Sequence, residues 1–266
     1  GYVSRSGGTT GKPKFSIYDE HDWEMMISEA VRVLRAAGME KGDRVANCML
    51  AGDLYGSFVS FDHINARLGA TSFAFAGHVV PDVFLDVWRQ FRFNVIQALP
   101  SVLVPLLRVA RQLEPDFAVE KILYAGTPLS ASDREWILGQ GVAKSVCSII
   151  GANDGGQLAF QCSHLTGSVH HLIDDFNYVE ILNDENRPVA EGQGGKIVIT
   201  SLLKYAFPLI RYELGDSARF VSGTCGCGRT NRMIEYLGRS DDTLCIGMMN
   251  LRYRDLWEVV QKFAVS

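Results

Sequence analysis

The sequence lacks the features that mark membrane-spanning, secreted and nucleic-acid-binding proteins. No apolar run approaches the ~20 residues that a membrane-spanning helix needs, and no charged-then-apolar leader of a secreted protein is visible. The 26 basic and 30 acidic residues give a net charge of −4, without the long block of one sign that favours nucleic-acid or membrane-surface binding. We therefore expect a cytoplasmic protein with no nucleic-acid partner and no membrane partner.

Cysteine is also scarce, with six residues in a chain of 266. In a long chain with no secretory leader, cysteines are typically reduced thiols or metal ligands rather than a disulfide framework. Hydrophobic residues make up 47% of the chain, enough for one large core or two smaller ones. The first residue is Gly1, and a glycine-rich loop follows within a few residues. We therefore expect the sequence to be part of a longer protein.

Short strand-like runs alternate with helical patterns over residues 1–160. Residues 19–37, for example, place apolar side chains at helical spacing and are followed by a glycine. This alternation predicts an α/β domain with a largely parallel sheet. Over 161–237, short strands are separated by turn-rich segments, which predicts a smaller β-rich subdomain. An amphipathic helix is expected over 255–263.

The loop in "SRSGGTTGKPKFSIY", from Ser4 to Tyr18, has the glycines, hydroxyls and lysines of a phosphate-binding loop. It is not a Walker A loop, because Ser6 stands where the first glycine is needed and Pro13 where the metal-binding hydroxyl is needed. It also leads into an extended run, whereas a Walker loop leads into a helix. We interpret it as a phosphate loop between two extended segments, with an ordinary hairpin loop as the alternative.

An ordered set of motifs resembles the adenylate-forming acyl ligases. "SGGTTGKPK" resembles their phosphate loop, "YAGTPLS" their adenine-lining loop, and "PLIRYELGD" their P-L-I-R-Y-R-T-G-D stretch, while "IIGANDGG" occupies the place of Y-G-x-[ST]-E. "CGCGRT…EYLGRSDD" resembles phenylacetate–CoA ligases in particular. Single motifs of this kind are weak, but the set keeps the family order from residue 4 to about residue 250.

The resemblance implies the large N-terminal α/β domain of an adenylate-forming enzyme, with mixed or parallel sheets flanked by helices. Residues 238–266 would be the hinge and the start of a C-terminal lid that is mostly absent. The implied reaction is ATP-dependent activation of an aryl or arylacetic carboxylic acid to an acyl-adenylate, followed by transfer to coenzyme A. The implied cofactors are ATP, Mg²⁺ and coenzyme A.

Two alternatives stay open at this point. The first is a ligase of the same fold that uses an amine or a carrier protein as the acceptor. The second is a degenerate nucleotide- or acyl-binding protein without turnover, which the departures described below favour. A homodimer is compatible with the sequence under each interpretation.

The resemblance also implies roles for individual residues around ATP. Asp216 would accept the ribose hydroxyls, and Arg239 would act near the ribose or phosphate as a catalytic residue. The adenine loop would contain Gly126, Thr127 and Pro128. The β- and γ-phosphates would be held by Ser6, Gly7, Gly8, Thr9, Thr10, Gly11 and Lys12.

The sequence departs from the family pattern at the segment from Ile150 to Asp154. Ile150 stands where the family has tyrosine, Asn153 replaces the hydroxyl that contacts the α-phosphate, and Asp154 replaces the Mg²⁺-binding glutamate. Asparagine still donates a hydrogen bond and aspartate is still a hard oxygen ligand. We therefore expect Asn153 and Asp154 to be catalytic, with Asp154 one methylene shorter than the usual ligand.

The acyl pocket and a second metal site are the remaining expectations. Position along the chain suggests a substrate pocket lined by Tyr55, Ala76, Gly77, His78 and Ala152, although an aromatic residue there is as readily explained by the core. A close thiol pair is typical of tetrahedral zinc sites. We expect a structural Zn²⁺, or else four unliganded side chains, at Cys162, His171, Cys225 and Cys227, with His170 as a substitute.

Overall fold

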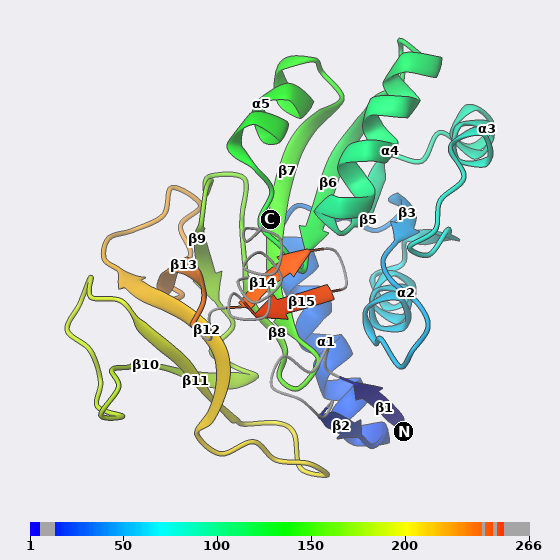
Figure 1. The fold of residues 1–266 in the computed structure, drawn as a ribbon. Helices are drawn as coiled ribbons and strands as arrows, with labels where there is room; N and C mark the ends of the chain where they lie inside the picture. Colours follow the sequence, from blue (N-terminus) through cyan, green and yellow to red (C-terminus); the bar gives the residue numbers. More distant parts are fainter. Residues whose placement is uncertain (6–13, 241–242, 247–248, 253–266) are drawn as a thin grey trace, which may run out of the picture.

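One mixed sheet of eleven strands runs through the chain, in the order β10-β11-β12-β13-β9-β8-β7-β6-β5-β3-β4. The structure is a computed structural model and describes residues 1–5, 14–240, 243–246 and 249–252 (Figure 1). Two further hairpins, β1–β2 and β14–β15, lie outside this sheet. Among the described helices, none is both long and apolar enough to cross a membrane.

The first part of the sheet is parallel. It contains β3 (Arg44–Cys48), β4 (Thr71–Ala74), β5 (Val95–Ala98), β6 (Val119–Ala125) and β7 (Ala143–Ala152). Parallel strands need a crossover, and helices supply it here. These helices, with α1 before β3, are α1 (Glu20–Ala36), α2 (Ser57–Leu68), α3 (Pro81–Phe91), α4 (Pro100–Leu113) and α5 (Ala131–Gly139).

Helices cover both faces of the parallel part. Alternate strand residues point to opposite faces, so that Val45 joins a buried cluster with α1 and α2, whereas Ala46 joins another with α3, α4 and α5. The helix predicted over residues 19–37 is confirmed as α1, and its N-cap Asp19 accepts a hydrogen bond from the Asp22 amide at 2.8 Å. Figure 1 shows α2, α3 and α4 on the side of the molecule away from β10–β13.

The rest of the sheet is antiparallel, whereas the largely parallel sheet predicted over residues 1–160 is confirmed by β3–β7. The direction changes between β7 and β8, close to the predicted boundary at residue 160, yet both parts belong to one sheet. Strands β8 and β9 were not predicted from the sequence. This part contains β8 (Gly156–Phe160), β9 (Val169–Leu172), β10 (Asn177–Leu182), β11 (Gly195–Ser201), β12 (Tyr212–Val221) and β13 (Met233–Arg239).

Two small hairpins lie near the ends of the chain. Strand β1 (Tyr2–Arg5) pairs antiparallel with β2 (Phe15–Tyr18), so the loop "SGGTTGKP" connects two strands and is not followed by a helix. Strand β14 (Thr243–Ile246) pairs with β15 (Met249–Arg252). The helix predicted over 255–263 lies outside the described residues.

Candidate nucleotide site and metal centre

The β1–β2 hairpin contacts the turn that holds Asn153 and Asp154. This turn joins β7 to β8. The Tyr18 hydroxyl donates hydrogen bonds to the carbonyl oxygens of Asn153 at 2.9 Å and of Asp154 at 3.1 Å. Ser4 Oγ donates to the Asn153 carbonyl at 3.3 Å. Strands on both sides of the expected phosphate loop therefore bind the turn that carries the two expected catalytic residues.

The Asn153 side chain faces the start of the loop. Its Nδ2 donates a hydrogen bond to the Arg5 carbonyl oxygen at 2.9 Å, and Arg5 is the last residue of β1. The sequence predicted a donor to the α-phosphate at this position. In the structure that donor holds the backbone from which the loop departs.

The Asp154 carboxylate is the better placed of the two for a metal ion. Asp154 is 9% exposed, and its Oδ2 accepts a hydrogen bond from the Tyr212 hydroxyl at 3.1 Å. Lys14 Nζ in turn donates to the Tyr212 hydroxyl at 3.1 Å. Burial raises the pKa of Tyr212, which keeps the phenol neutral beside Asp154. Carboxylate oxygen is a ligand type that Mg²⁺ takes in proteins, so Asp154 could supply one of its ligands.

Asp216 and Arg239 are cross-strand partners on β12 and β13. Asp216 Oδ1 accepts a hydrogen bond from the Tyr236 hydroxyl at 2.8 Å and lies 3.4 Å from Arg239 Nη1. Arg239 Nη1 also lies 3.4 Å from the Leu214 carbonyl oxygen. The structure therefore brings together the expected ribose acceptor and the expected hinge arginine, which are 23 residues apart in the sequence.

A bulge in β12 determines where Asp216 lies. Residues 214–216 stand opposite the single residue Ile197 of β11, and Gly215 has a φ of 78° that favours glycine. Extra residues of this kind bend a strand and redirect its side chains. Asp216 lies within this strand rather than at a turn or a helix cap.

The expected adenine loop follows directly after β6. Gly126 has a φ of 91°, and a Cβ atom there would lie 3.2 Å from the Leu99 side chain. Thr127 is half-buried and Pro128 is exposed. Strand β6 is parallel to β7, so this loop and the Asn153 turn leave the same edge of the sheet, where ligands of α/β proteins commonly bind.

The residues expected around the acyl pocket lie in two segments and one strand end. Tyr55 is half-buried against the cluster of α1 and α2, in agreement with a role in the core. A Cβ atom at Gly77 would lie 2.3 Å from the Leu50 side chain, so the turn at Ala76 and Gly77 packs tightly on the chain before Tyr55. His78 is exposed, and Ala152 ends β7 beside the Asn153 turn.

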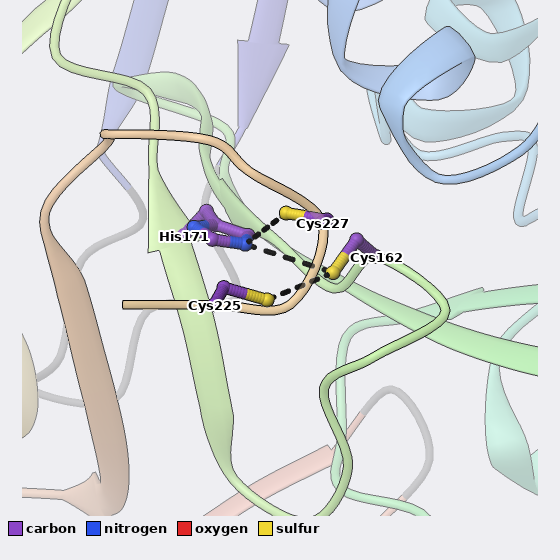
Figure 2. A group of neighbouring side chains, drawn as sticks. All are labelled: Cys162, His171, Cys225 and Cys227. Carbon is purple, nitrogen blue, oxygen red and sulfur yellow. Dashed lines mark hydrogen bonds between the residues drawn. The ribbon is translucent and has the colours of Figure 1, made fainter. Parts of the chain in front are cut away.

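Four side chains converge at the ends of β8 and β12 and on β9, away from the Asn153 turn (Figure 2). Cys162 Sγ lies 3.5 Å from Cys225 Sγ and 3.6 Å from His171 Nε2, which lies 3.4 Å from Cys227 Sγ. All four ligand atoms lie within 4.8 Å of one another. Tetrahedral zinc with bonds of about 2.3 Å to sulfur and 2.0 Å to nitrogen implies ligand separations of about 3.5–3.8 Å. The geometry therefore fits Zn²⁺.

Local structure explains why these four residues meet. His171 is on β9, Cys162 follows β8, and the turn between β12 and β13 carries both Cys225 and Cys227. The pairing of β13 with β9 places that turn beside His171. His170 points elsewhere, since its Nδ1 hydrogen bonds with the Ser168 carbonyl at 2.8 Å. The structure thus places together the four expected ligands and not the substitute.

Sequence reasoning missed three side chains around Asp154, which are Tyr18, Tyr212 and Lys204. No spacing motif marks the two tyrosines. Lys204 carried a weak signal, because it is one lysine inside the apolar run "SLLKYAFPLI". The expected phosphate-loop residues lie outside the described residues, and these are Ser6, Gly7, Gly8, Thr9, Thr10, Gly11 and Lys12.

Comparison with known proteins places the chain in a family. Residues 2–202 match the AMP-binding enzyme family, and the chain belongs to it. The chain is 30% identical over 269 residues to the phenylacetate-coenzyme A ligase of Escherichia coli (strain K12), a match that covers 98% of the chain and 60% of the relative. The corresponding ligase of Thermus thermophilus is 30% identical over 257 residues, covering 94% of the chain and 57% of the relative.

Solved structures agree with the fold. A 2-hydroxyisobutyryl-CoA ligase in complex with 2-HIB-AMP and CoA matches with a TM-score of 0.85 and 22% identity, over 98% of this chain and 57% of that one. The O-succinylbenzoate coenzyme A synthetase of Bacillus subtilis, in complex with ATP and magnesium ion, matches with a TM-score of 0.68 and 17% identity, over 98% and 55%. The resemblance to adenylate-forming enzymes is confirmed, and the chain spans about 60% of the length of its curated relatives.

Proposed function

We propose that the protein activates a carboxylic acid with ATP and transfers the acyl group to coenzyme A, with an aryl or arylacetic acid as the substrate class. A carboxylate oxygen attacks the α-phosphorus of ATP, and pyrophosphate leaves. The thiol sulfur of coenzyme A then attacks the acyl carbon, and AMP leaves. The phenylacetate-coenzyme A ligases at about 30% identity support this reaction and this substrate class.

One observation carries the proposal more than any other. The hairpin on which the phosphate loop is mounted binds the Asn153–Asp154 turn through Tyr18 and Ser4. A loop that holds phosphates and a carboxylate that holds a metal ion are useful together only if they face the same ligand. The direct hydrogen bonds between the hairpin and the Asn153–Asp154 turn support a nucleoside triphosphate site at this place.

The residues of the chain would orient the reactants and neutralise charge, since adenylation depends mainly on positioning and electrostatics. Asp154 would hold Mg²⁺, which supplies charge neutralisation at the phosphates when bound. Asp216 would accept the ribose hydroxyls, and Arg239 would keep its carboxylate in place. Gly126, Thr127 and Pro128 would face the adenine. Asn153 would fix the loop through Arg5.

Pyrophosphate exchange into ATP tests the proposal. We expect the full-length wild-type protein, with the segments that its relatives have beyond this sequence, to exchange with at least one acid in a panel of phenylacetate, benzoate and hydroxyisobutyrate. Asp216→Ala should reduce exchange by at least about 100-fold, because the ribose would lose its acceptor. The exposed aspartate Asp184 gives the matched control, and Asp184→Ala should leave exchange unchanged.

The same experiment separates the two alternatives. ATP binding without exchange for any acid would favour a nucleotide-binding protein without turnover. Exchange without thioester formation when coenzyme A is added would favour an amine or a carrier protein as acceptor. Equal exchange by Asp216→Ala and wild type would exclude the assigned nucleotide site.

We also propose that Cys162, His171, Cys225 and Cys227 hold one structural Zn²⁺. Three sulfurs and one imidazole nitrogen at the separations given above support a closed tetrahedral site. Such an ion would fix the turn between β12 and β13 to β9.

Metal analysis of the purified protein should give about one zinc per chain, and Cys227→Ser should give much less. Cys48→Ser, at a buried thiol outside the cluster, is the matched control. Well under one zinc per wild-type chain would contradict the assignment.

A further inference from the structure

Lys204 is a buried lysine that lies beside the Asp154 turn. It is 1% exposed, and its Nζ donates hydrogen bonds to Ser16 Oγ at 2.5 Å and to the Asp154 carbonyl oxygen at 3.0 Å. The Lys204 ammonium group lies over the face of the Tyr18 ring, with Nζ 3.9 Å from the ring centroid. One cation therefore touches strand β2 at two residues and the catalytic turn at a third.

Burying the Lys204 ammonium group in this way should destabilise the fold, so stability alone does not explain it. Among the described residues, the hydrogen-bond acceptors of Lys204 are a hydroxyl and a carbonyl oxygen rather than a carboxylate, and a buried charge without an ion-pair partner is strongly disfavoured. Burial lowers the pKa of Lys204 to about 8, against the opposing charges of Asp154 and Asp22. An apolar side chain of similar length would fill the same space without that cost, so packing does not explain why a lysine stands here.

The backbone around Lys204 is itself anchored. The Asp22 carboxylate, which is fully buried on α1, accepts hydrogen bonds from the amides of Tyr205 at 2.7 Å and Ala206 at 3.0 Å. The ammonium group is thus presented from a segment tied to α1. The same segment leads into β12, where Tyr212 contacts the Asp154 carboxylate, so Asp154 is held at its backbone and at its side chain from one stretch of chain.

We propose that Lys204 is a positioning residue that fixes the Asp154 turn against the strand following the phosphate loop. The proposal deepens the function proposed above and rests on it for the consequence to catalysis. Lys204 acts through Asp154 and β2 rather than through a contact with the substrate. Removing it should leave the fold intact but allow the Asp154 turn and β2 to move relative to each other.

Hydrogen exchange of the ligand-free full chain gives the first test, and it needs no ATP. In Lys204→Met, we expect amides of the β7–β8 turn to exchange at least about tenfold faster than in wild type, because one of its anchors is lost. Amides of β5, in the middle of the parallel part, should be unchanged. Lys144→Met is the matched control, since Lys144 is an exposed lysine paired with Glu120. Equal exchange of the turn in Lys204→Met and wild type would overturn the proposal.

MgATP binding and exchange kinetics give the second test. In Lys204→Met we expect MgATP affinity to fall at least about fivefold, ATP affinity in EDTA to change less than about twofold, and kcat for pyrophosphate exchange to fall roughly 10- to 100-fold. The KM for the acid should stay within about twofold. A uniform loss of all these quantities would indicate general damage and contradict a positioning role.

Two further variants keep the test decisive. If Lys204→Met does not fold, Ser16→Ala removes the acceptor on β2 and should reproduce the faster exchange of the turn. Tyr18→Phe removes the hydroxyl that holds the same turn, so its effect and that of Lys204→Met should be non-additive. A wild type that binds MgATP but shows no exchange with any acid would refute the proposed function alone. Unchanged turn dynamics and MgATP affinity in these variants would refute the positioning role alone.

Discussion

The parallel and antiparallel parts of the sheet differ in what their side chains do. In the parallel part, helices cover both faces, and two large buried clusters contain aliphatic and aromatic residues such as Phe84, Phe93 and Phe117. In the antiparallel part, the sheet carries Asp216 and Arg239 on β12 and β13 and the four expected zinc ligands at its margin. The antiparallel part also has a buried cluster, and in addition it carries polar groups whose positions depend on turns and bulges.

The Asn153–Asp154 turn lies where the two parts join. It ends the last parallel strand and begins the first antiparallel one. This location lets the turn receive contacts from β2 through Tyr18, from β12 through Tyr212 and from the segment of Lys204. The proposed catalytic residues therefore lie where the parallel and antiparallel pairings meet.

The largest effect is expected from a truncation in the parallel part. Phe117 is fully buried and contacts the rings of Phe84, Trp88 and Phe93, so Phe117→Ala should lower the free energy of unfolding by about 3–5 kcal/mol. Denaturant titration measures this. Leu113→Ala, at an exposed helix end, should cost well under about 1 kcal/mol. A similar loss for both would contradict the assigned core.

Removal of metal should have the next largest effect, confined to the antiparallel part. When the free zinc concentration is well above the dissociation constant, bound zinc stabilises the folded state. Chelation should then lower the free energy of unfolding by about 2–4 kcal/mol. It should also expose Cys162, Cys225 and Cys227 to a thiol reagent, while Cys48 and Cys147, both buried, stay protected. Thermal unfolding with and without a chelator, with thiol counting, checks this; identical curves would argue against a structural ion.

A pH-dependent difference should separate Lys204 from the other lysines. Its pKa is lowered from 10.5 to about 8 in the folded chain, mainly by burial. Between these values the unfolded chain binds more protons at this group, so stability rises with pH. The free energy of unfolding of wild type minus that of Lys204→Met should therefore increase from about pH 8 to about pH 10, by at most about 1.4 kcal/mol per pH unit. A flat difference would mean that the ammonium group is not buried in solution.

The smallest effect is expected at the surface of the antiparallel part. Arg219 and Glu235 form a cross-strand ion pair at 2.6 Å with both side chains partly exposed. Such pairs contribute little in water, so Arg219→Ala should change the free energy of unfolding by less than about 1 kcal/mol and leave exchange activity unchanged. A loss above about 2 kcal/mol would show that charge pairs matter more here than burial.

The sequence predicted the parallel part well and the antiparallel part less well. Helical spacing and alternating strands are local properties, so α1 and the helices after it were visible in the pattern. Strands β8 and β9, of five and four residues, were not predicted from the sequence. The bulge before Asp216 depends on pairing with β11, which no local pattern contains.

The sequence by itself determined the family and predicted a non-Walker phosphate loop and the residue types of both candidate sites, because ordered motifs and ligand chemistry can be recognised along the chain. The tertiary structure brings His171, the first choice from the sequence, and not the substitute His170, to the three cysteines. It also decided that Asn153 binds the Arg5 backbone and that Lys204 supports Asp154. These contacts join residues up to 148 positions apart, and their geometry follows from strand order rather than from spacing in the sequence.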